Sequence, residues 1–249
     1  MRSIDLNSDL GEGAGHDAEI MPLVTSTNIA CGAHAGDERT MRDAVELALR
    51  HGVAVGAHPG YPDRENFGRL PLAMDSLALI ESVAAQVRAL SEIAGTLGAR
   101  VRHVKAHGAM YNQAERDPAI ASAVASGIWD DTRGAALLVF APPNSAMLER
   151  AAAMDLRVAR EGFVDRAYEP DGTLRSRRLP GALHTDPRVA AAQAVSFVTE
   201  GGVRAHDGSF LPLEVETLCL HGDTPGAPAI AHAVREALAR EGIAVRAPA

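Results

Sequence analysis

Lysine is nearly absent from this chain. Of the 24 basic residues among 249, only Lys105 is a lysine, and the formal net charge is -8. The arginines form no basic cluster of the kind that nucleic acid or an anionic membrane surface attracts. The composition therefore argues against both as partners.

Long apolar runs and an export signal are missing as well. No stretch approaches the ~18 apolar residues of a membrane-spanning helix. The first residues, MRSIDLNSDL, contain no apolar signal-peptide core. We therefore expect a cytoplasmic protein. Only two cysteines occur, Cys31 and Cys219, and in that compartment we expect both thiols to stay reduced.

What the sequence does contain is a regular alternation of strand-like and helix-like segments, which is typical of a parallel α/β fold. The expected strands cover residues 3–7, 27–31, 53–57, 102–107, 136–141, 156–161 and 217–221. The expected helices cover residues 37–51, 75–98, 117–129, 144–154, 186–200 and 227–241. A chain of 249 residues suits one barrel-like domain, residues 1–249.

Two connections depart from this alternation. The first two strands are joined by a segment too short for a full helix. Residues 166–185 carry proline, glycine and four arginines without a period, so we interpret them as a functional loop. The strand count of seven stays open, because an eighth strand could lie in residues 203–208 or 174–180.

Polar side chains share one face of several expected strands. Side chains alternate along a strand, so Asp5, Asn7 and Asp9 share one face of the first strand. In VRHVKAH, His103, Lys105 and His107 likewise oppose Val104 and Ala106. Apolar faces toward helices and polar faces toward a closed interior favour a (β/α) barrel over an open doubly wound sheet. In such barrels the site forms at the C-terminal ends of the strands.

The segments at those strand ends carry ionisable groups beside glycines: NSDLGEG, CGAHAGD, GAHPGYPD, KAHGAMYN, GFVDRAY and HGDTPGA. Glycine lets the chain turn tightly and lets a ligand approach the backbone. One histidine near a strand end is more often structural than catalytic. Four of them at four different ends, His34, His58, His107 and His221, favour an active site.

Further candidates come from the same segments. We assign substrate binding to the acidic, amide, aromatic and basic residues Asp5, Asn7, Glu12, Asp63, Tyr111, Asn112, Asp165, Arg166, His221 and Asp223. Each also has a simpler reading: the acids can tie loops together or cap helices, and Tyr111 can be a wall residue. Asp37 precedes a long helix and suits an N-cap, so it is not a candidate.

Lys105 stands out because arginine serves at every other basic position. An ammonium is a compact charge whose pKa moves readily on burial, whereas a guanidinium stays charged and needs a fork-shaped partner. Lys105 could polarise a carbonyl or phosphoryl oxygen, carry a proton or form a Schiff base. The simpler reading is a buried ion pair with Asp5 or Asp9.

Six blocks resemble the signature blocks of the LamB/YcsF family, the A subunit of bacterial 5-oxoprolinase. They are IDLNSDLGEG, TNIACGAHAGD, GAHPGYPD followed by FGR, VKAHGAMYN, GFVDRAY and LHGDTPGA, in the family's order and over nearly the whole chain. The family usually has a cysteine at the position of Ser8 and an aromatic residue at that of Ala33. Neither departure removes an ionisable candidate.

The resemblance implies a seven-stranded (β/α) barrel related to polysaccharide deacetylases and glycoside hydrolases. It also implies the ATP-dependent opening of 5-oxo-L-proline to L-glutamate, in which ATP is hydrolysed to ADP and phosphate. ATP would bind together with a divalent cation, Mg²⁺, and 5-oxoprolinase subunits B and C would be partners. The chain has no G-x-x-x-x-G-K-[ST] motif, so the position of ATP is not predicted.

For that reaction we assign catalysis to Lys105, His107, Asp9, His58 and His34. Lys105 and Arg166, with an arginine from 175, 177 or 178, would hold a phosphate or carboxylate. The acid and the histidines would orient water, move protons or bind a divalent ion. Replacing Lys105 by arginine should abolish turnover and leave the fold intact.

Two alternatives stay open. A nucleotide-independent amide hydrolase or deacetylase could hold a catalytic metal on Asp9, His34 and His58, since one acid and two histidines suffice. A non-catalytic subunit could use the same polar pocket only to bind a small acid or a sugar. Bound metal with ATP-independent hydrolysis would favour the first, and binding without turnover the second.

Overall fold

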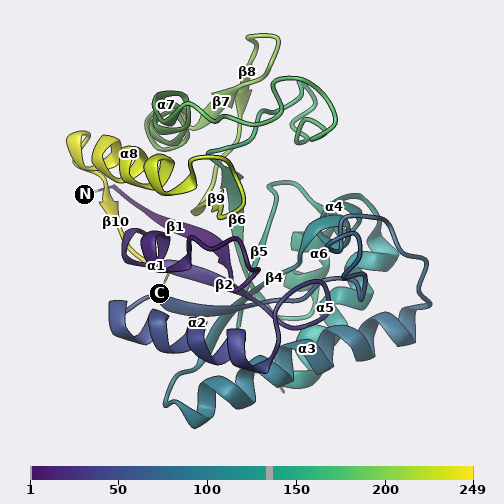
Figure 1. Ribbon diagram of the computed structural model, residues 1–249. Helices are drawn as coiled ribbons and strands as arrows, with labels where there is room; N and C mark the ends of the chain where they lie inside the picture. The colour runs from purple at the N-terminus through teal and green to yellow at the C-terminus, as the bar shows by residue number, and fades with distance from the viewer. Residues whose placement is uncertain (1, 133–136, 249) are drawn as a thin grey trace.

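Parallel strands of the described residues close into a seven-stranded barrel. The computed structural model describes residues 2–132 and 137–248. The strands are β1 (Ser3–Leu10), β2 (Ser26–Ala30), β3 (Ala54–His58), β4 (Val101–Lys105), β5 (Leu138–Ala141), β6 (Arg157–Phe163) and β9 (Thr217–His221). Each pairs with the next, and β9 pairs back with β1, which closes the ring (Figure 1). The predicted barrel is confirmed; Ala136, where we expected one strand to start, lies outside the described residues.

Helices cover the outside of this barrel (Figure 1). They are α2 (Glu38–His51), α3 (Ser76–Thr96), α4 (Gly108–Arg116), α5 (Pro118–Thr132), α6 (Ala146–Ala153), α7 (Pro187–Thr199) and α8 (Ala227–Arg240). Only α1 (Asp17–Ile20) and the 3-10 turn η1 (Met21–Leu23) link β1 to β2, as expected. Asp37 caps α2 by accepting from the Thr40 backbone N–H at 2.8 Å, which confirms its predicted role.

Helix α4 was not predicted. It starts with Gly108 at φ +55°, and its N-cap residue, His107, makes no side-chain capping bond. A sequence search for a capping residue therefore finds no start signal here. The consequence for function is direct, since α4 follows β4 at once and places Tyr111 and Asn112 beside the strand end.

Neither candidate for an eighth barrel strand joins the barrel. Residues 203–208 contribute to a separate antiparallel hairpin of β7 (Gly202–Arg204) and β8 (Phe210–Pro212). Its turn is fixed by Asp207, whose carboxylate accepts from Ser209 N–H at 2.9 Å. Residues 174–180 form only a single bridge between Leu174 and Tyr168. The strand that does extend the sheet is β10 (Ala244–Val245), which pairs with the start of β1.

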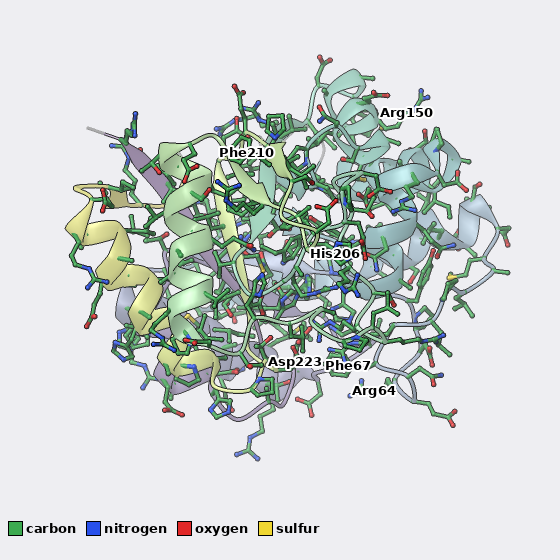
Figure 2. All side chains as sticks on the ribbon, turned by 90° about the horizontal axis from the view of Figure 1, so that it is seen from above. Arg64, Phe67, Arg150, His206, Phe210 and Asp223 are labelled. Carbon is green, nitrogen blue, oxygen red and sulfur yellow. The ribbon has the colours of Figure 1, made fainter. Side chains whose placement is uncertain are left out.

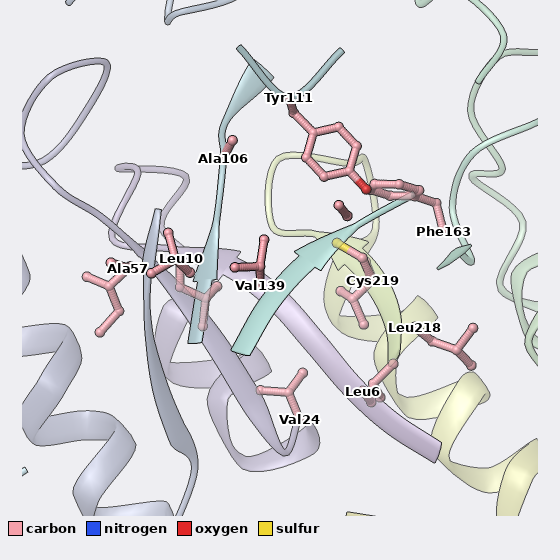
Figure 3. Close-up of a cluster of buried hydrophobic side chains, with 14 of the residues drawn as sticks. Leu6, Leu10, Val24, Ala57, Ala106, Tyr111, Val139, Phe163, Leu218 and Cys219 are labelled. Atoms are coloured by element: carbon pink, nitrogen blue, oxygen red, sulfur yellow. The ribbon is translucent and has the colours of Figure 1, made fainter. Parts of the chain in front are cut away.

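Apolar side chains fill the layer between the strands and the helices. Leu6 and Leu218 are adjacent in register on β1 and β9 and lie in this cluster with Leu10 and Val24 (Figure 3). All four are at most 4% exposed. This layer holds the strands in place and thereby fixes the interior side chains that alternate with it.

The barrel interior is unusually polar around β1, where barrels commonly hold branched aliphatic residues. Asp5 accepts hydrogen bonds from the hydroxyls of Thr25 at 2.7 Å, Ser26 at 2.8 Å and Thr217 at 2.6 Å. Burial raises the pKa of Asp5 to about 6, although these three hydrogen bonds oppose the rise. Asp5 is therefore a structural group at the floor of the interior.

Asparagines form the next layer. The amide of Asn28 donates to Asn7 Oδ1 at 2.8 Å and to Asp9 Oδ1 at 2.7 Å, and Asn7 donates to Thr217 Oγ1 at 2.7 Å. His103 Nε2 donates to Asn28 Oδ1 at 2.8 Å, and its ring stacks on Phe140. Every member of this network is buried and partnered, which favours one fixed arrangement of the strand ends above it.

His103 should make the fold sensitive to acid. Burial first, then Lys105 and His58, lower its pKa from 6.5 to about 3, against the smaller opposing influence of Asp9. Between those values the unfolded chain binds a proton that the folded chain does not, so stability falls as pH falls, by about 1.4 kcal/mol per pH unit. His103→Gln, which keeps a donor for Asn28, should reduce this slope.

Urea unfolding at pH 7, 6 and 5 measures that slope. Arg102→Gln, on the exposed side of the same strand, is the control and should keep the wild-type slope. Equal slopes for His103→Gln and wild type would show that His103 does not carry the acid sensitivity.

Candidate functional site

A pocket of about 530 Å³ opens at the C-terminal ends of the strands. Its wall includes the catalytic candidates Asp9, His58, Lys105 and His107 and the binding candidates Glu12, Tyr111, Asn112, Arg166, His221 and Asp223. Most of the site residues predicted from the sequence therefore line one cavity. Because these residues come from five different strand ends and the loops after them, only the closed barrel brings them together.

Lys105 lines the pocket and is 2% exposed. Its Nζ donates to Asp9 Oδ1 and Cys219 Sγ, both at 2.9 Å, and lies 3.1 Å from Glu161 Oε1. Burial alone would lower the pKa of Lys105, but Asp9, Cys219 and Glu161 raise it well above its usual value. Lys105 is therefore an ammonium, and it forms the expected buried ion pair with Asp9 while also lining the pocket.

The structure leaves little room for an arginine at this position. Nζ already has three partners within 3.1 Å, and a guanidinium is larger. Overpacking of this kind typically destabilises a fold by about 1–3 kcal/mol. The expectation that Lys105→Arg leaves the fold intact is therefore not supported by the packing.

Glu161 is a site residue that the sequence reasoning missed. It is 1% exposed and sits between three partners: Lys105, the amide of Asn7 at 3.0 Å and the hydroxyl of Tyr111, which donates at 2.7 Å. Strand alternation could have placed Glu161 in the barrel interior, because it shares one strand face with the buried residues Ala159 and Phe163. The expected strand ended at this residue, which hid the alternation.

Histidines and Glu12 form a second cluster beside Lys105. His58 Nε2 lies 3.0 Å from His107 Nδ1, and Glu12 Oε1 lies 3.2 Å from both His107 Nδ1 and His34 Nε2. His34 lies behind His107, with the two rings stacked 3.7 Å apart, and is not part of the pocket wall. Its Nδ1 has no hydrogen-bond partner among the described residues.

Burial and mutual charges shift the pKa values in this cluster. Burial lowers the pKa of His34 to about 4 and also lowers that of His107, although Glu12 opposes both changes. Burial acts in the same direction on His58, but Asp9 and Glu12 outweigh it and raise its pKa. For Asp9, burial favours the neutral acid, and the charges of His58 and Lys105 overcome it and lower the pKa well below the usual value.

Two groups of residues in the described part of the chain have the geometry to hold a metal ion. One is Glu12, His34, His58 and His107; the other is Asp9, Cys219 and His221. The set predicted from the sequence, Asp9, His34 and His58, is neither of these. Asp9 lies beside His58, with Oδ2 3.3 Å from Nε2, and its Oδ1 accepts from Lys105. The geometry groups His34 and His58 with Glu12 and His107, and Asp9 with Cys219 and His221.

His221 reaches the pocket from the end of β9. Its Nδ1 lies 3.0 Å from both oxygens of Asp165, and Thr224 donates to the same carboxylate at 2.6 Å. Burial favours the neutral form of Asp165, but His221 and these hydrogen bonds lower its pKa. Asp165 is thus buried behind His221 and orients the ring, whose face stacks on Phe163.

Arginines of the long loop line the outer wall, as the loop's composition indicated. Arg166 is 7% exposed and donates to Arg175 O at 2.7 Å, while its Nε has no partner among the described residues. Burial, then Arg177, lower the pKa of Arg166 to about 10. Arg177 and Arg178 also line the pocket, whereas Arg175 bonds Pro180 O and Glu169 outside it.

The rim is completed by the loop after β3. Arg69 contacts Asp223 and stacks over the ring of Phe67 at 4.8 Å, and Asp223 and Phe67 appear next to each other in the view of Figure 2. Arg177 lies 3.3 Å from the same Asp223 oxygen. Loops that follow three different strands therefore meet at the mouth.

Four predicted binding residues lie outside the pocket wall: Asp5, Asn7, Asp63 and Asp165. The first two belong to deeper interior layers, and Asp165 stands behind His221. Asp63 Oδ1 accepts from the amide of Asn66 at 2.9 Å and fixes the turn before Phe67. Direct substrate contact is not supported for these four, because each is engaged in holding other residues.

The LamB/YcsF family model matches residues 4–249. The chain belongs to the LamB/YcsF family. Curated relatives in this family include the 5-oxoprolinase A subunit of Chloroflexus aggregans, 49% identical over 100% of both chains. Another is the 5-oxoprolinase A subunit of Methylococcus capsulatus, 47% identical over 99% of this chain and 96% of the relative. These names connect the family to a hydrolase of more than one subunit.

Solved structures agree with the fold. The lactam utilization protein of Thermus thermophilus superposes with a TM-score of 0.92 at 44% identity, covering 99% of this chain and 100% of the other. A peptidoglycan deacetylase of Bacillus subtilis gives a TM-score of 0.50 at 12% identity over 98% and 87%, a likeness of fold alone. Within the described residues, no helix has the length and apolar character to cross a membrane.

Proposed function

We propose that this chain is the A subunit of an ATP-dependent 5-oxoprolinase. The complex would cleave 5-oxo-L-proline to L-glutamate, with ATP hydrolysed to ADP and phosphate, in the cytoplasm and together with subunits B and C. The names of relatives at 47–49% identity support the family role. The observation that carries the chemistry is the buried Lys105 ammonium, which faces the pocket between Asp9 and Glu161.

The chemistry requires a cationic pocket with a base. A five-membered lactam is an unreactive amide. Phosphoryl transfer to its oxygen makes the lactam carbonyl carbon electrophilic enough for water to attack. Such transfer depends on positioning and on cations around the phosphate. Lys105 and Arg166 supply two of these, and Arg177 and Arg178 lie farther out on the same wall.

A substrate carboxylate and a developing phosphate both need such charges. Arg166 is the better partner for the carboxylate, since its fork-shaped head matches two oxygens and its Nε is not engaged by the described residues. Lys105, a buried point charge that lines the pocket, suits the lactam oxygen or the phosphate transferred to it. Asp9 lies 2.9 Å from Lys105 Nζ and 3.3 Å from His58 Nε2, so it can orient water or accept a proton there.

Reconstitution tests the proposal. Glutamate is measured from 5-oxo-L-proline with and without ATP and Mg²⁺, for this chain alone and after mixing with subunits B and C. We expect ATP-dependent glutamate only in the mixture. Folded partners and ATP without any glutamate would contradict the proposed substrate.

The Glu12 and histidine cluster favours one second candidate, a metal-dependent hydrolase that opens an amide without nucleotide. Imidazole and carboxylate ligands would hold a zinc ion here, and such an ion would activate a water molecule if one coordination position stayed open. In this case the isolated chain would hydrolyse an amide substrate, ATP would not change the rate, and a chelator would abolish it. The same assay with chelator and without ATP separates the two candidates.

A further inference from the structure

Four side chains at one side of the pocket turn their basic atoms toward one another. They are Glu12 Oε, His34 Nε2, His58 Nε2 and His107 Nδ1, and all lie within 4.8 Å of one another. Three come from the ends of β2, β3 and β4, and Glu12 comes from the loop after β1. The side chains are buried, with at most 7% of each exposed.

The positions of the protons follow from the neighbouring carbonyls. His58 Nδ1 lies 2.8 Å from Lys105 O, and His107 Nε2 lies 2.8 Å from Phe67 O. A carbonyl oxygen only accepts, so both of these nitrogens carry hydrogen. In neutral rings the other two nitrogens, His58 Nε2 and His107 Nδ1, then face each other as lone pairs across 3.0 Å. Glu12 Oε1 lies 3.2 Å from His107 Nδ1 and 3.6 Å from His58 Nε2, and Asp9 Oδ2 lies 3.3 Å from His58 Nε2. Either a proton on His58 or a metal ion must therefore lie among these atoms.

Charge decides between a proton and a metal ion. In this part of the site three buried carboxylates face one ammonium: Asp9 and Glu161 contact Lys105, and Glu12 lies among the histidines with 5% of its side chain exposed. With neutral histidines, two negative charges stay unbalanced. One added proton neutralises half of that excess, whereas one divalent ion neutralises all of it.

The geometry also matches a metal site. Ligands about 2.0–2.1 Å from a tetrahedral ion are separated by roughly 3.3–3.4 Å. Four of the separations here are 3.0, 3.2, 3.2 and 3.6 Å, and all four atoms lie within 4.8 Å of one another. Histidines that bind metals commonly donate their second nitrogen to a carbonyl or carboxylate, which fixes the ring. His58 and His107 both do this.

The carbonyl that orients His107 is itself held under strain. Phe67 has φ +57°, a backbone region that costs a residue with a side chain about 1–2 kcal/mol. The turn is fixed by Asp63 and by Gly68 N–H, which donates to Asp63 O at 2.7 Å. Strain of this kind persists where surrounding structure maintains it, and it is common at functional sites.

We propose that Glu12, His34, His58 and His107 bind one divalent transition-metal ion, such as Zn²⁺. Imidazole-rich ligands favour zinc, iron, nickel or copper over Mg²⁺, which prefers oxygen ligands, so this ion is distinct from the Mg²⁺ expected with ATP. Glu12, His58 and His107 line the pocket. The bound ion therefore faces the same cavity as Lys105.

Metal binding is measured without turnover, so this proposal and the proposed function can fail separately. The chain is expressed in full, freed of metal with a chelator and titrated with Zn²⁺ and Co²⁺. Calorimetry gives the stoichiometry, and the visible spectrum of Co²⁺ reports on nitrogen ligation. We expect about one ion per chain, with Co²⁺ displaced by Zn²⁺.

Variants identify the ligands. Glu12→Gln, His58→Gln and His107→Gln should each weaken Zn²⁺ binding at least about 100-fold, more than the loss of a supporting hydrogen bond. His34→Gln should weaken it less, because His34 is not part of the pocket wall and its Nδ1 has no partner among the described residues to fix the ring. His16→Gln is the control, since that histidine follows Glu12 in the same loop and its side chain is 43% exposed. It should bind as wild type does.

Two outcomes would overturn the proposal. One is a wild-type chain that binds neither ion, in which case a proton on one imidazole satisfies the lone pairs. The other is an Asp9→Asn variant that loses binding while Glu12→Gln and His107→Gln keep it, which would return the site to Asp9, His34 and His58. Circular dichroism on each variant confirms that a loss of binding is not a loss of fold.

Discussion

Lys105→Met should lower the free energy of unfolding by about 3–5 kcal/mol, the usual effect of removing one partner of a buried ion pair. The variant keeps the apolar length of the side chain and removes only the charge. Asp9 and Glu161, 4% and 1% exposed, would then be two buried carboxylates without their shared cation. Urea unfolding at pH 7 measures the change.

A second substitution separates charge from packing. Lys105→Met combined with Glu161→Gln removes one of the two stranded carboxylates, so it should recover at least about 1 kcal/mol relative to Lys105→Met alone. Arg102→Met is the matched control, because it removes an exposed charge from the same strand and should change stability by no more than about 0.5 kcal/mol. A Lys105→Met effect as small as the control would mean that the ammonium contributes no net stability.

Period-two alternation explains why so much of the site could be predicted. Asp9, Lys105 and His107 were expected on interior faces because polar residues alternate with mainly apolar ones on these strands, and the closed sheet obeys that alternation. The strand ends carry the pocket because the strands are parallel. Both the assignment to interior faces and the position of the pocket could be inferred without knowing any contact between side chains.

Depth within the barrel could not be predicted in the same way. Alternation assigns Asp5, Asn7 and Asp9 to one face and does not say which of them reaches the ligand. That depends on the stagger between strands, such as the pairing of Asp9 with His221 and of Asp5 with Thr217. Asp5 consequently lies in the floor and Asp9 in the pocket.

Loop geometry accounts for the remaining difference, in which Glu12 contacts His34 and His107 while Asp9 reaches only His58 of the three clustered histidines. Gly11 and Gly13, at φ +72° and +83°, allow the chain after β1 to turn in a way that residues with side chains rarely adopt. That turn points Glu12 back across the strand ends toward His34 and His107. A sequence pattern identifies the glycines but not the direction of the turn.

Asp9→Asn should lower kcat of the reconstituted complex by about 10²–10⁴-fold, the range for loss of a positioned proton acceptor. Asparagine fits the same space and removes the negative charge that faces Lys105 at 2.9 Å and His58 at 3.3 Å. KM for 5-oxo-L-proline should change much less, because Arg166 and the outer arginines are untouched. Glutamate formation over a range of substrate concentrations gives both constants.

Asp223→Asn provides the comparison within the same pocket. Its carboxylate contacts Arg69 and Arg177 at the rim. The variant should therefore raise KM more than it lowers kcat, because it loosens arginines that we propose contact the substrate. The opposite dependence on the two constants distinguishes a group at the reacting atoms from one that shapes the entrance. If Asp9→Asn instead raised KM and left kcat within a few-fold of wild type, Asp9 would belong to binding, and the proton acceptor would have to be sought among the histidines.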